Sequence, residues 1–271
     1  IVSIFMPAIM GIVADRWVQA QRLLSFCHFM AAVFMGLATW VGLAVGPGEV
    51  NGFALFSLYT MSVAFYMPTL ALSNSVAYTS LDKVGLDTVK AFPPIRVFGT
   101  VGFICAMLFV DFTKFQNTPY QFLVSGVISL VLALYSFTLP HCDVGRNSGK
   151  QSISEALGLK AFSLFRDRKM AFFFIFSLLL GVSLQITNGY ANPYIQSFGK
   201  YPEYEGLFFV EHSNLLISLS QMSETLCILL IPFALKRFGI KNVMLISMFA
   251  WVGRFGFFGF GNPGNGVWLF F

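Results

Sequence analysis

One acidic side chain, Glu224, lies in the middle of the apolar stretch 215–235. A helix needs roughly 20 mostly apolar residues to cross a bilayer, and this stretch is long enough. Because a charged side chain at the bilayer centre costs about 3 kcal/mol or more, we expect Glu224 to face another helix or water rather than lipid. In a helix, polar residues spaced three and four apart fall on one face with it. That polar stripe contains Asn214, Ser218, Gln221, Glu224 and Thr225.

A second set of side chains with the same kind of spacing lies in the stretch 92–110. Arg96, Thr100 and Phe103 are at positions i, i+4 and i+7, so a helix places them on one face. Arginine can donate hydrogen bonds to a polar solute, and here it has a threonine and a phenylalanine stacked on its face. The alternative is that Arg96, near the cytoplasmic end, extends its side chain toward the membrane surface.

The stretch 170–192 contains a further polar stripe, with Gln185 and Asn188 at its centre and Asn192 at its end. Amide side chains offer paired donors and acceptors, which suit sugar hydroxyls or the edge of a base. Hydrogen bonding between helices is an equally good explanation. For Arg254, inside the stretch 243–260, two roles stay open: pairing with an acid on a helix outside this sequence, or reaching the far interface.

The elements that must position these side chains are membrane helices. The 271 residues are 56% hydrophobic and 11% charged, whereas soluble domains carry about 25% charged residues. The pattern predicts an all-α integral membrane protein with complete spans at 23–45, 50–71, 92–110, 120–139, 170–192, 215–235 and 243–260. The segment 1–14 is too short to span and 267–271 stops as it starts. We therefore expect an interior piece of a longer chain.

The basic residues indicate topology rather than a nucleic-acid partner, because they do not gather in one patch. Of the 17 Lys and Arg residues, 13 lie in alternate loops, at 15–22, 80–91, 141–169 and 236–241. The positive-inside rule places these loops in the cytoplasm. The stretch 141–169 then becomes a cytoplasmic linker with a helix at the membrane surface. This linker divides the chain into bundles at 1–140 and 170–271.

A weak repeat supports this division, because 7–24 and 232–245 both contain a proline, an apolar run and a short basic turn. Two bundles joined by a long cytoplasmic loop are the layout of major facilitator transporters. The motif Gly11-x-x-x-Asp15-Arg16 resembles the signature between the second and third helices of that superfamily. The resemblance implies two six-helix bundles, of which this chain holds the second helix to the start of the tenth. Asp15 and Arg16 would belong to the gate on the cytoplasmic side; an ordinary basic loop is the alternative.

Several longer stretches resemble one family closely. They include Tyr66-Met67-Pro68-Thr69-Leu70, Phe92-Pro93-Pro94-Ile95-Arg96, Leu184-Gln185-Ile186-Thr187-Asn188 and Gln221-Met222-Ser223-Glu224-Thr225. By these motifs the chain is identified as a member of the bacterial nucleoside:proton symporter family, the nucleoside permeases of Gram-negative inner membranes. The resemblance implies a secondary active transporter that imports a nucleoside such as uridine or adenosine together with a proton. We expect a monomer in the lipid bilayer with no cofactor, no metal and no enzymatic activity.

The family binds its nucleoside between the two bundles. Carried onto this sequence, the resemblance implies a substrate site made of Arg96, Thr100, Phe103, Gln185, Asn188, Gln221 and Glu224. Phe103 would pack on the base, Gln185 and Asn188 would read its polar edges, and Gln221 and Glu224 would hold the ribose. Arg96 would bond the substrate or balance Glu224. Glu224 is also the candidate for proton coupling, with an acid on a helix outside this sequence as the alternative.

Two other functions are compatible with the polar stripes alone. One is a major facilitator transporter of another polar solute, such as a sugar or an organic anion, which a panel of competitors would distinguish. The other is a membrane receptor that binds its ligand and transports nothing. An intramembrane enzyme is the weakest candidate, because the sequence has no nucleophile–base pair and no set of residues at metal-ligand spacing.

Overall fold

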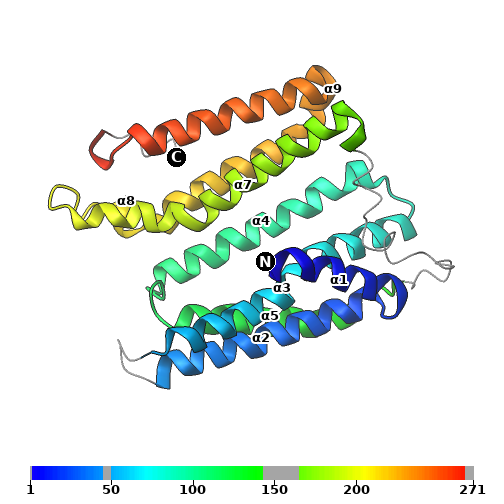
Figure 1. Cartoon of the computed structure of the whole chain (residues 1–271), viewed down its shortest axis with the longest axis horizontal. Helices are drawn as coiled ribbons and strands as arrows, with labels where there is room; N and C mark the ends of the chain where they lie inside the picture. Colours follow the sequence, from blue (N-terminus) through cyan, green and yellow to red (C-terminus); the bar gives the residue numbers. More distant parts are fainter. Residues whose placement is uncertain (1, 45–49, 143–164, 266–271) are drawn as a thin grey trace. The chain divides into compact units, whose positions relative to one another are not determined.

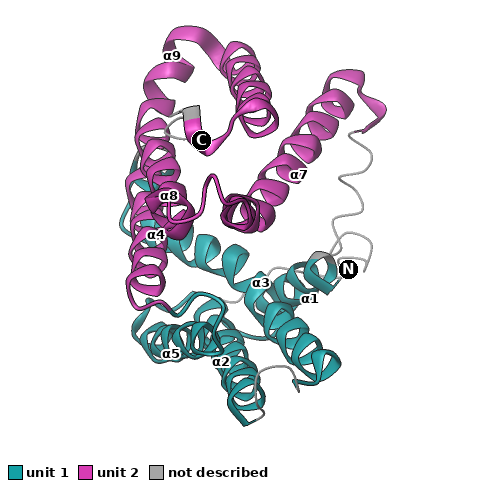
Figure 2. Ribbon diagram, turned by 90° about the vertical axis from the view of Figure 1, so that its left-hand side faces the viewer, with its two compact units in different colours: residues 1–92, 115–163 teal, residues 93–114, 164–271 magenta. Residues whose placement is uncertain are grey.

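The computed structural model describes residues 2–44, 50–142 and 165–265, which contain α-helices and 3₁₀-helices but no strand (Figure 1). The chain forms two compact units, coloured separately in Figure 2. Unit 1 consists of Ile1–Phe92 and Phe115–Ser163, and unit 2 of Pro93–Lys114 and Leu164–Phe271.

Unit 1 is built around one long helix, α2 (Ala20–Ala44), which packs against its neighbours α3 (Gly52–Lys83) and α5 (Tyr120–Tyr135). The remaining elements of this unit are α1 (Val2–Arg16) and the 3₁₀-helix η1 (Ser136–Thr138). Small hydroxyls join the helices: Ser25 Oγ donates to the carbonyl of Ala133 at 2.7 Å, and Ser62 Oγ to that of Ala31 at 3.1 Å. These bonds satisfy polar groups that lipid could not.

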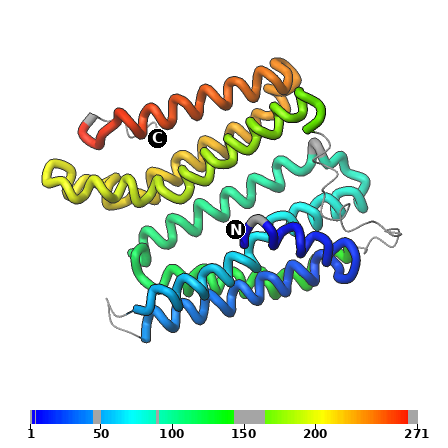
Figure 3. The backbone as a smooth tube through the Cα atoms, viewed as in Figure 1, coloured from blue at the N-terminus to red at the C-terminus, as the bar shows by residue number. Residues whose placement is uncertain are grey.

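Unit 2 contains most of α4 (Thr88–Phe112), then α7 (Arg168–Ser197), η3 (Phe198–Lys200), α8 (Phe208–Glu211), α9 (Ser213–Phe260) and η4 (Pro263–Asn265). The helix α9 is interrupted at Gly239, whose φ of 73° and ψ of 162° are not helical. Glycine adopts this backbone conformation without steric cost. Figure 3 shows the tube folding back there, so α9 consists of a first half, 213–238, and a second half, 240–260.

The membrane spans predicted from hydropathy are confirmed. Six helices of the described chain are long and apolar enough to cross a membrane, and they are α2, α3, α4, α5 extended by η1, α7 extended by η3, and α9. The last is 48 residues long, about twice what one crossing needs. The break at Gly239 divides it into the two spans that the sequence predicts on either side of the basic turn.

Two predicted boundaries are wrong. The helix α4 begins at Thr88 rather than Phe92, so Pro93 and Pro94 lie inside it. Its first bond runs from the amide of Ala91 to the carbonyl of Asp87, at 2.9 Å, which shows that a turn forms before the prolines. The helix α7 continues through Pro193 instead of ending before it, since membrane helices tolerate an internal proline. The loop predicted at 193–211 is correspondingly shorter and contains η3 and α8.

Two predictions about domain organisation remain predictions. Most of the linker predicted at 141–169, with its surface helix, lies outside the described residues. The two units do not coincide with the predicted bundles 1–140 and 170–271, because Pro93–Lys114 belongs to unit 2.

Candidate functional site

Polar side chains at one end of α7 and α9 bind one another. Asn192 Nδ2 donates to Asn214 Oδ1 at 2.6 Å, and Ser213 Oγ donates to Asn192 Oδ1 at 2.5 Å. Gln196 Nε2 adds a bond to Ser213 Oγ at 3.3 Å. Ser213 and Asn214 are buried. These four residues are here called the paired cluster. For its two members from the predicted stripes, Asn192 and Asn214, helix–helix hydrogen bonding is the correct interpretation.

Two further bonds fix the helices near the paired cluster. Tyr194 Oη on α7 donates to the carbonyl of Phe258 at 2.6 Å, and this carbonyl is close to the end of α9, where helical partners run out. His212 Nδ1, just before α9, lies 2.8 Å from Asp111 Oδ2, near the end of α4. Within unit 2, α4, α7 and both halves of α9 are therefore tied together by side-chain bonds.

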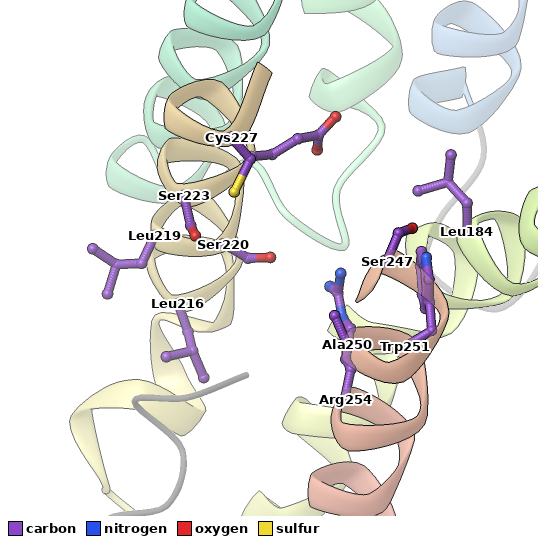
Figure 4. A pocket seen from close by; sticks show the side chains of 11 residues that line it. Leu184, Leu216, Leu219, Ser220, Ser223, Cys227, Ser247, Ala250, Trp251 and Arg254 are labelled. Atoms are coloured by element: carbon purple, nitrogen blue, oxygen red, sulfur yellow. The ribbon is translucent and has the colours of Figure 1, made fainter. Parts of the chain in front are cut away.

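Beyond the paired cluster, the two halves of α9 and part of α7 enclose a cavity of about 640 Å³ (Figure 4). This volume lies in the range of small-molecule sites, about 300–1,000 Å³. Its lining mixes aliphatic side chains with hydroxyls and charges, and consists of Leu184, Leu216, Leu219, Ser220, Ser223, Glu224, Cys227, Ser247, Ala250, Trp251 and Arg254.

Two opposite charges belong to this cavity. Glu224 comes from the first half of α9 and Arg254 from the second. Within the described residues, no hydrogen bond or ion pair joins the two side chains, and the buried Nε of Arg254 has no hydrogen-bond partner. The guanidinium lies over the ring of Trp251, 5.3 Å from its centroid. The cavity therefore offers an acceptor and a donor that are not used up on each other.

The predicted residues of α7 and α9 are placed around this cavity to different degrees. Glu224 lines it. Gln221 is one turn away and half-buried, while Gln185 and Asn188 are exposed on α7, where Gln185 follows the lining residue Leu184. The lining itself includes Glu224 but not Gln221, Gln185 or Asn188. A substrate role for those three stays a prediction.

The predicted residues of α4 also belong to unit 2, and none of them lines this cavity. Thr100 is buried, whereas Arg96 and Phe103 are exposed. The Arg96 side chain runs along its own helix past Gly99. A Cβ atom added to Gly99 would lie only 3.1 Å from Arg96 Nη1. Gly99 thus leaves room for the guanidinium. The substrate role of this face stays a prediction.

In unit 1, Asp15 and Arg16 end α1 and precede the short turn to α2. Asp15 is exposed, and the amide of Trp17 just after them bonds to the carbonyl of Val13 at 2.9 Å, which closes the helix end. Their role in a cytoplasmic gate stays a prediction.

Sequence reasoning missed the face that the second half of α9 presents to the cavity. Ser247, Trp251 and Arg254 line it at spacings of four and three. This is the same i, i+4, i+7 spacing that singled out Arg96, Thr100 and Phe103. Applied to the stretch 243–260, it would have grouped Arg254 with a hydroxyl and an aromatic ring.

Comparison with known proteins settles the family. The model of the nucleoside H⁺ symporter family matches residues 1–270. The chain belongs to this family. Over 263 residues it is 44% identical to the nucleoside permease NupG of Escherichia coli (strain K12), covering 97% of this chain and 61% of that protein. It is 45% identical to the xanthosine permease of the same strain, with the same coverage. The chain therefore spans 61% of the length of each of these curated relatives.

A solved structure of this nucleoside H⁺ symporter family has the same fold. The crystal structure of a mutant of the nucleoside transporter NupG matches with a TM-score of 0.85 and 43% sequence identity, covering 99% of this chain and 65% of that one. The match confirms the prediction of an all-α fold of the major facilitator type.

Proposed function

We propose that the protein is a secondary active transporter that imports nucleosides together with protons across the bacterial inner membrane. The observation that carries the proposal is the cavity of unit 2, in which Glu224 and Arg254 supply opposite charges. It occurs in a chain of the nucleoside H⁺ symporter family. A nucleoside combines an apolar ring with ribose hydroxyls. A cavity that combines aliphatic walls with serines and two charged groups suits such a solute.

The proposed substrate site extends beyond the cavity lining to the stripes predicted from the sequence. Glu224 accepts hydrogen bonds from ribose hydroxyls, and such charge-assisted bonds are stronger than neutral ones. Gln221, on the same helix face, supports the ribose. Gln185 and Asn188 bind the polar edges of the base. In this proposal α4 closes the site, with Phe103 on the base, Thr100 beside it, and Arg96 bonded to the substrate or balancing Glu224.

Glu224 is also our candidate for carrying the coupled proton. Among the described residues of the spans, Glu224 is the acid that lines the cavity. One carboxylate would therefore bind both the substrate and the proton. The protein acts as a monomer without enzymatic activity in this proposal. Its linker at 141–169 lies in the cytoplasm, and Asp15 and Arg16 stabilise the closed cytoplasmic side.

Transport by the full-length protein in proteoliposomes tests the proposal. Labelled uridine uptake is followed with a proton gradient directed inward, before and after an uncoupler collapses it. Glu224→Gln is compared with Glu205→Gln, a matched change at an exposed acid outside the cavity. We expect uphill uptake in wild type and Glu205→Gln that the uncoupler abolishes, and a loss of uptake in Glu224→Gln.

The other outcomes each remove a part of the proposal. No uridine uptake by wild type contradicts the substrate class, and uridine binding without uptake indicates a receptor. Uptake that ignores the uncoupler contradicts symport. If Glu224→Gln still accumulates uridine uphill, the proton is carried elsewhere and Glu224 is at most a ligand.

A further inference from the structure

We propose that Arg254 is a further substrate-binding residue, which acts with Glu224 as a donor and acceptor pair for the ribose hydroxyls. The inference rests on the proposed function, because it names the part of the nucleoside that this cavity holds. It assigns a role to a helix face that sequence reasoning left undecided.

The geometry places the two groups for such a role. Figure 4 shows Arg254 and Trp251 on one half of α9 and Ser220, Ser223 and Cys227 on the other, with the cavity between them. Glu224, from that other half, also lines the cavity, and no hydrogen bond or ion pair between Glu224 and Arg254 is present in the described structure. Both side chains therefore keep bonding capacity for a ligand in the cavity.

The chemistry of a hydroxyl fits this arrangement. A hydroxyl has one donor and two acceptor positions, whereas an ionised carboxylate only accepts and a guanidinium only donates. A hydroxyl between Glu224 and Arg254 can donate to the first and accept from the second. Both bonds are charge-assisted, and ribose presents two neighbouring hydroxyls. A carboxylate alone would leave the acceptor positions of these hydroxyls unused.

Arg254 is also held in place for this purpose. Its guanidinium lies over Trp251 at 5.3 Å, which restricts its orientation through a cation–π contact. Its buried Nε has no hydrogen-bond partner among the described residues. Lysine would keep the charge but not the planar fork of donors.

The competing explanation is that Arg254 only balances the charge of Glu224. The two explanations differ in what happens when the substrate lacks hydroxyls. If Arg254 bonds the ribose, its removal matters only for a substrate that has those hydroxyls. If it acts only as a counter-charge, its removal weakens both substrates equally.

The test measures the Kd of purified full-length protein for uridine and for 2′,3′-dideoxyuridine by isothermal titration calorimetry. The variants are Arg254→Gln and Arg254→Lys. The control is Arg237→Gln, which removes an arginine that also lies over an aromatic ring, Phe238 at 5.6 Å, outside the cavity. Melting temperatures identify any variant that fails to fold.

We expect Arg254→Gln to weaken uridine binding by about 10- to 100-fold, the effect of one lost bond to a charged group. Binding of dideoxyuridine should stay within about threefold of wild type. Arg254→Lys should fall between Arg254→Gln and wild type for uridine, and Arg237→Gln should bind like wild type.

If Arg254→Gln weakens binding of both ligands equally, or does not weaken uridine binding, the inference is overturned. The proposed function still stands in that case if wild type takes up uridine with the proton gradient. Equal wild-type affinity for uridine and dideoxyuridine would also overturn it. If wild type neither binds nor transports uridine, the proposed function fails and the inference fails with it. If Arg254→Gln unfolds, the Arg254→Lys result decides, and wild-type uridine affinity in that variant overturns the inference.

Discussion

At one end of α7 and α9, Asn192, Ser213 and Asn214 hydrogen-bond with one another between the helices. Ten residues after Asn214, about 15 Å along the helix, Glu224 lines a cavity together with Arg254. The first group uses its donors and acceptors on itself, whereas Glu224 and Arg254 are not bonded to each other in the described structure. Two polar side chains on the first half of α9 therefore differ in their partners. Asn214 is bonded to α7, whereas Glu224 lines the cavity.

This difference has an energetic basis. Hydrogen bonds between membrane helices contribute modestly to stability, on average about 0.6 kcal/mol, because the alternatives in the unfolded state are also satisfied. A polar group that faces a cavity keeps its bonding capacity for a ligand. Changes in the paired cluster should therefore affect stability, and changes in the cavity should affect binding. Three substitutions and one chemical probe test this separation.

The largest effect is expected for Glu224→Gln. The variant removes a charged acceptor from the proposed ribose site, and a bond to a charged group contributes about 1.5–3 kcal/mol. We expect uridine binding to weaken by about 10- to 100-fold in isothermal titration calorimetry. Wild-type affinity in this variant would remove Glu224 from the site.

A smaller effect is expected for Asn214→Leu in the paired cluster. Half-buried Asn192 Nδ2 then loses its acceptor, the Oδ1 of buried Asn214 at 2.6 Å. An unsatisfied buried group costs about 1–3 kcal/mol, so the melting temperature should fall while the Kd for uridine stays unchanged. The double variant Asn192→Leu with Asn214→Leu should recover part of the loss, because both partners are then apolar. A double variant that melts lower than either single one would contradict this explanation.

Cys227 provides a chemical probe of the cavity. Cys27 and Cys142 are buried and Cys105 is exposed, so in a Cys105→Ser background Cys227 is the exposed thiol. Cys227 lines the cavity one turn from Glu224. Uridine at ten times its Kd should slow alkylation by N-ethylmaleimide about tenfold, as followed by intact mass spectrometry. Alkylation at an unchanged rate would place the nucleoside elsewhere.

The smallest effect is expected for Tyr194→Phe. The variant loses the bond from Tyr194 Oη to the carbonyl of Phe258 but keeps the ring contact between these two residues. One neutral hydrogen bond contributes about 0.5–1.5 kcal/mol, so the melting temperature should fall slightly. Uridine binding should not change, and a loss of binding would show that the two regions are coupled.

Much of the fold could be predicted from the sequence, because the cost of unsatisfied backbone groups in lipid leaves few options for long apolar stretches. Glu224 could be singled out for a similar reason, since a charge in the middle of a span is expensive and needs a purpose. The ends of α4 and α7 could not be placed, because Pro93 and Pro193 are tolerated inside helices when other bonds support the turn.

The division of the polar residues into paired and open groups could not be predicted either. It depends on which side chains of α7 contact those of α9. The periodicity of a single helix does not show how two helices are aligned against each other. Asn188 and Asn192 share a stripe, yet Asn192 is bonded to α9 and Asn188 is exposed. Arg254 reaches the cavity of Glu224 only because the chain folds back at Gly239, so spacing along 243–260 alone does not place Ser247, Trp251 and Arg254 beside Glu224.

The most direct test of the separation is one thermal melting experiment, with and without saturating uridine, on wild type, Glu224→Gln and Asn214→Leu. A ligand that binds only the folded state stabilises it by RT ln(1 + [L]/Kd), so weaker binding gives a smaller gain at the same uridine concentration. We predict that Glu224→Gln melts near wild type without uridine and gains little from it. Asn214→Leu should melt lower without uridine and gain as much as wild type. If Asn214→Leu loses the gain from uridine, or Glu224→Gln keeps all of it, the cavity is not the binding site and the account is contradicted.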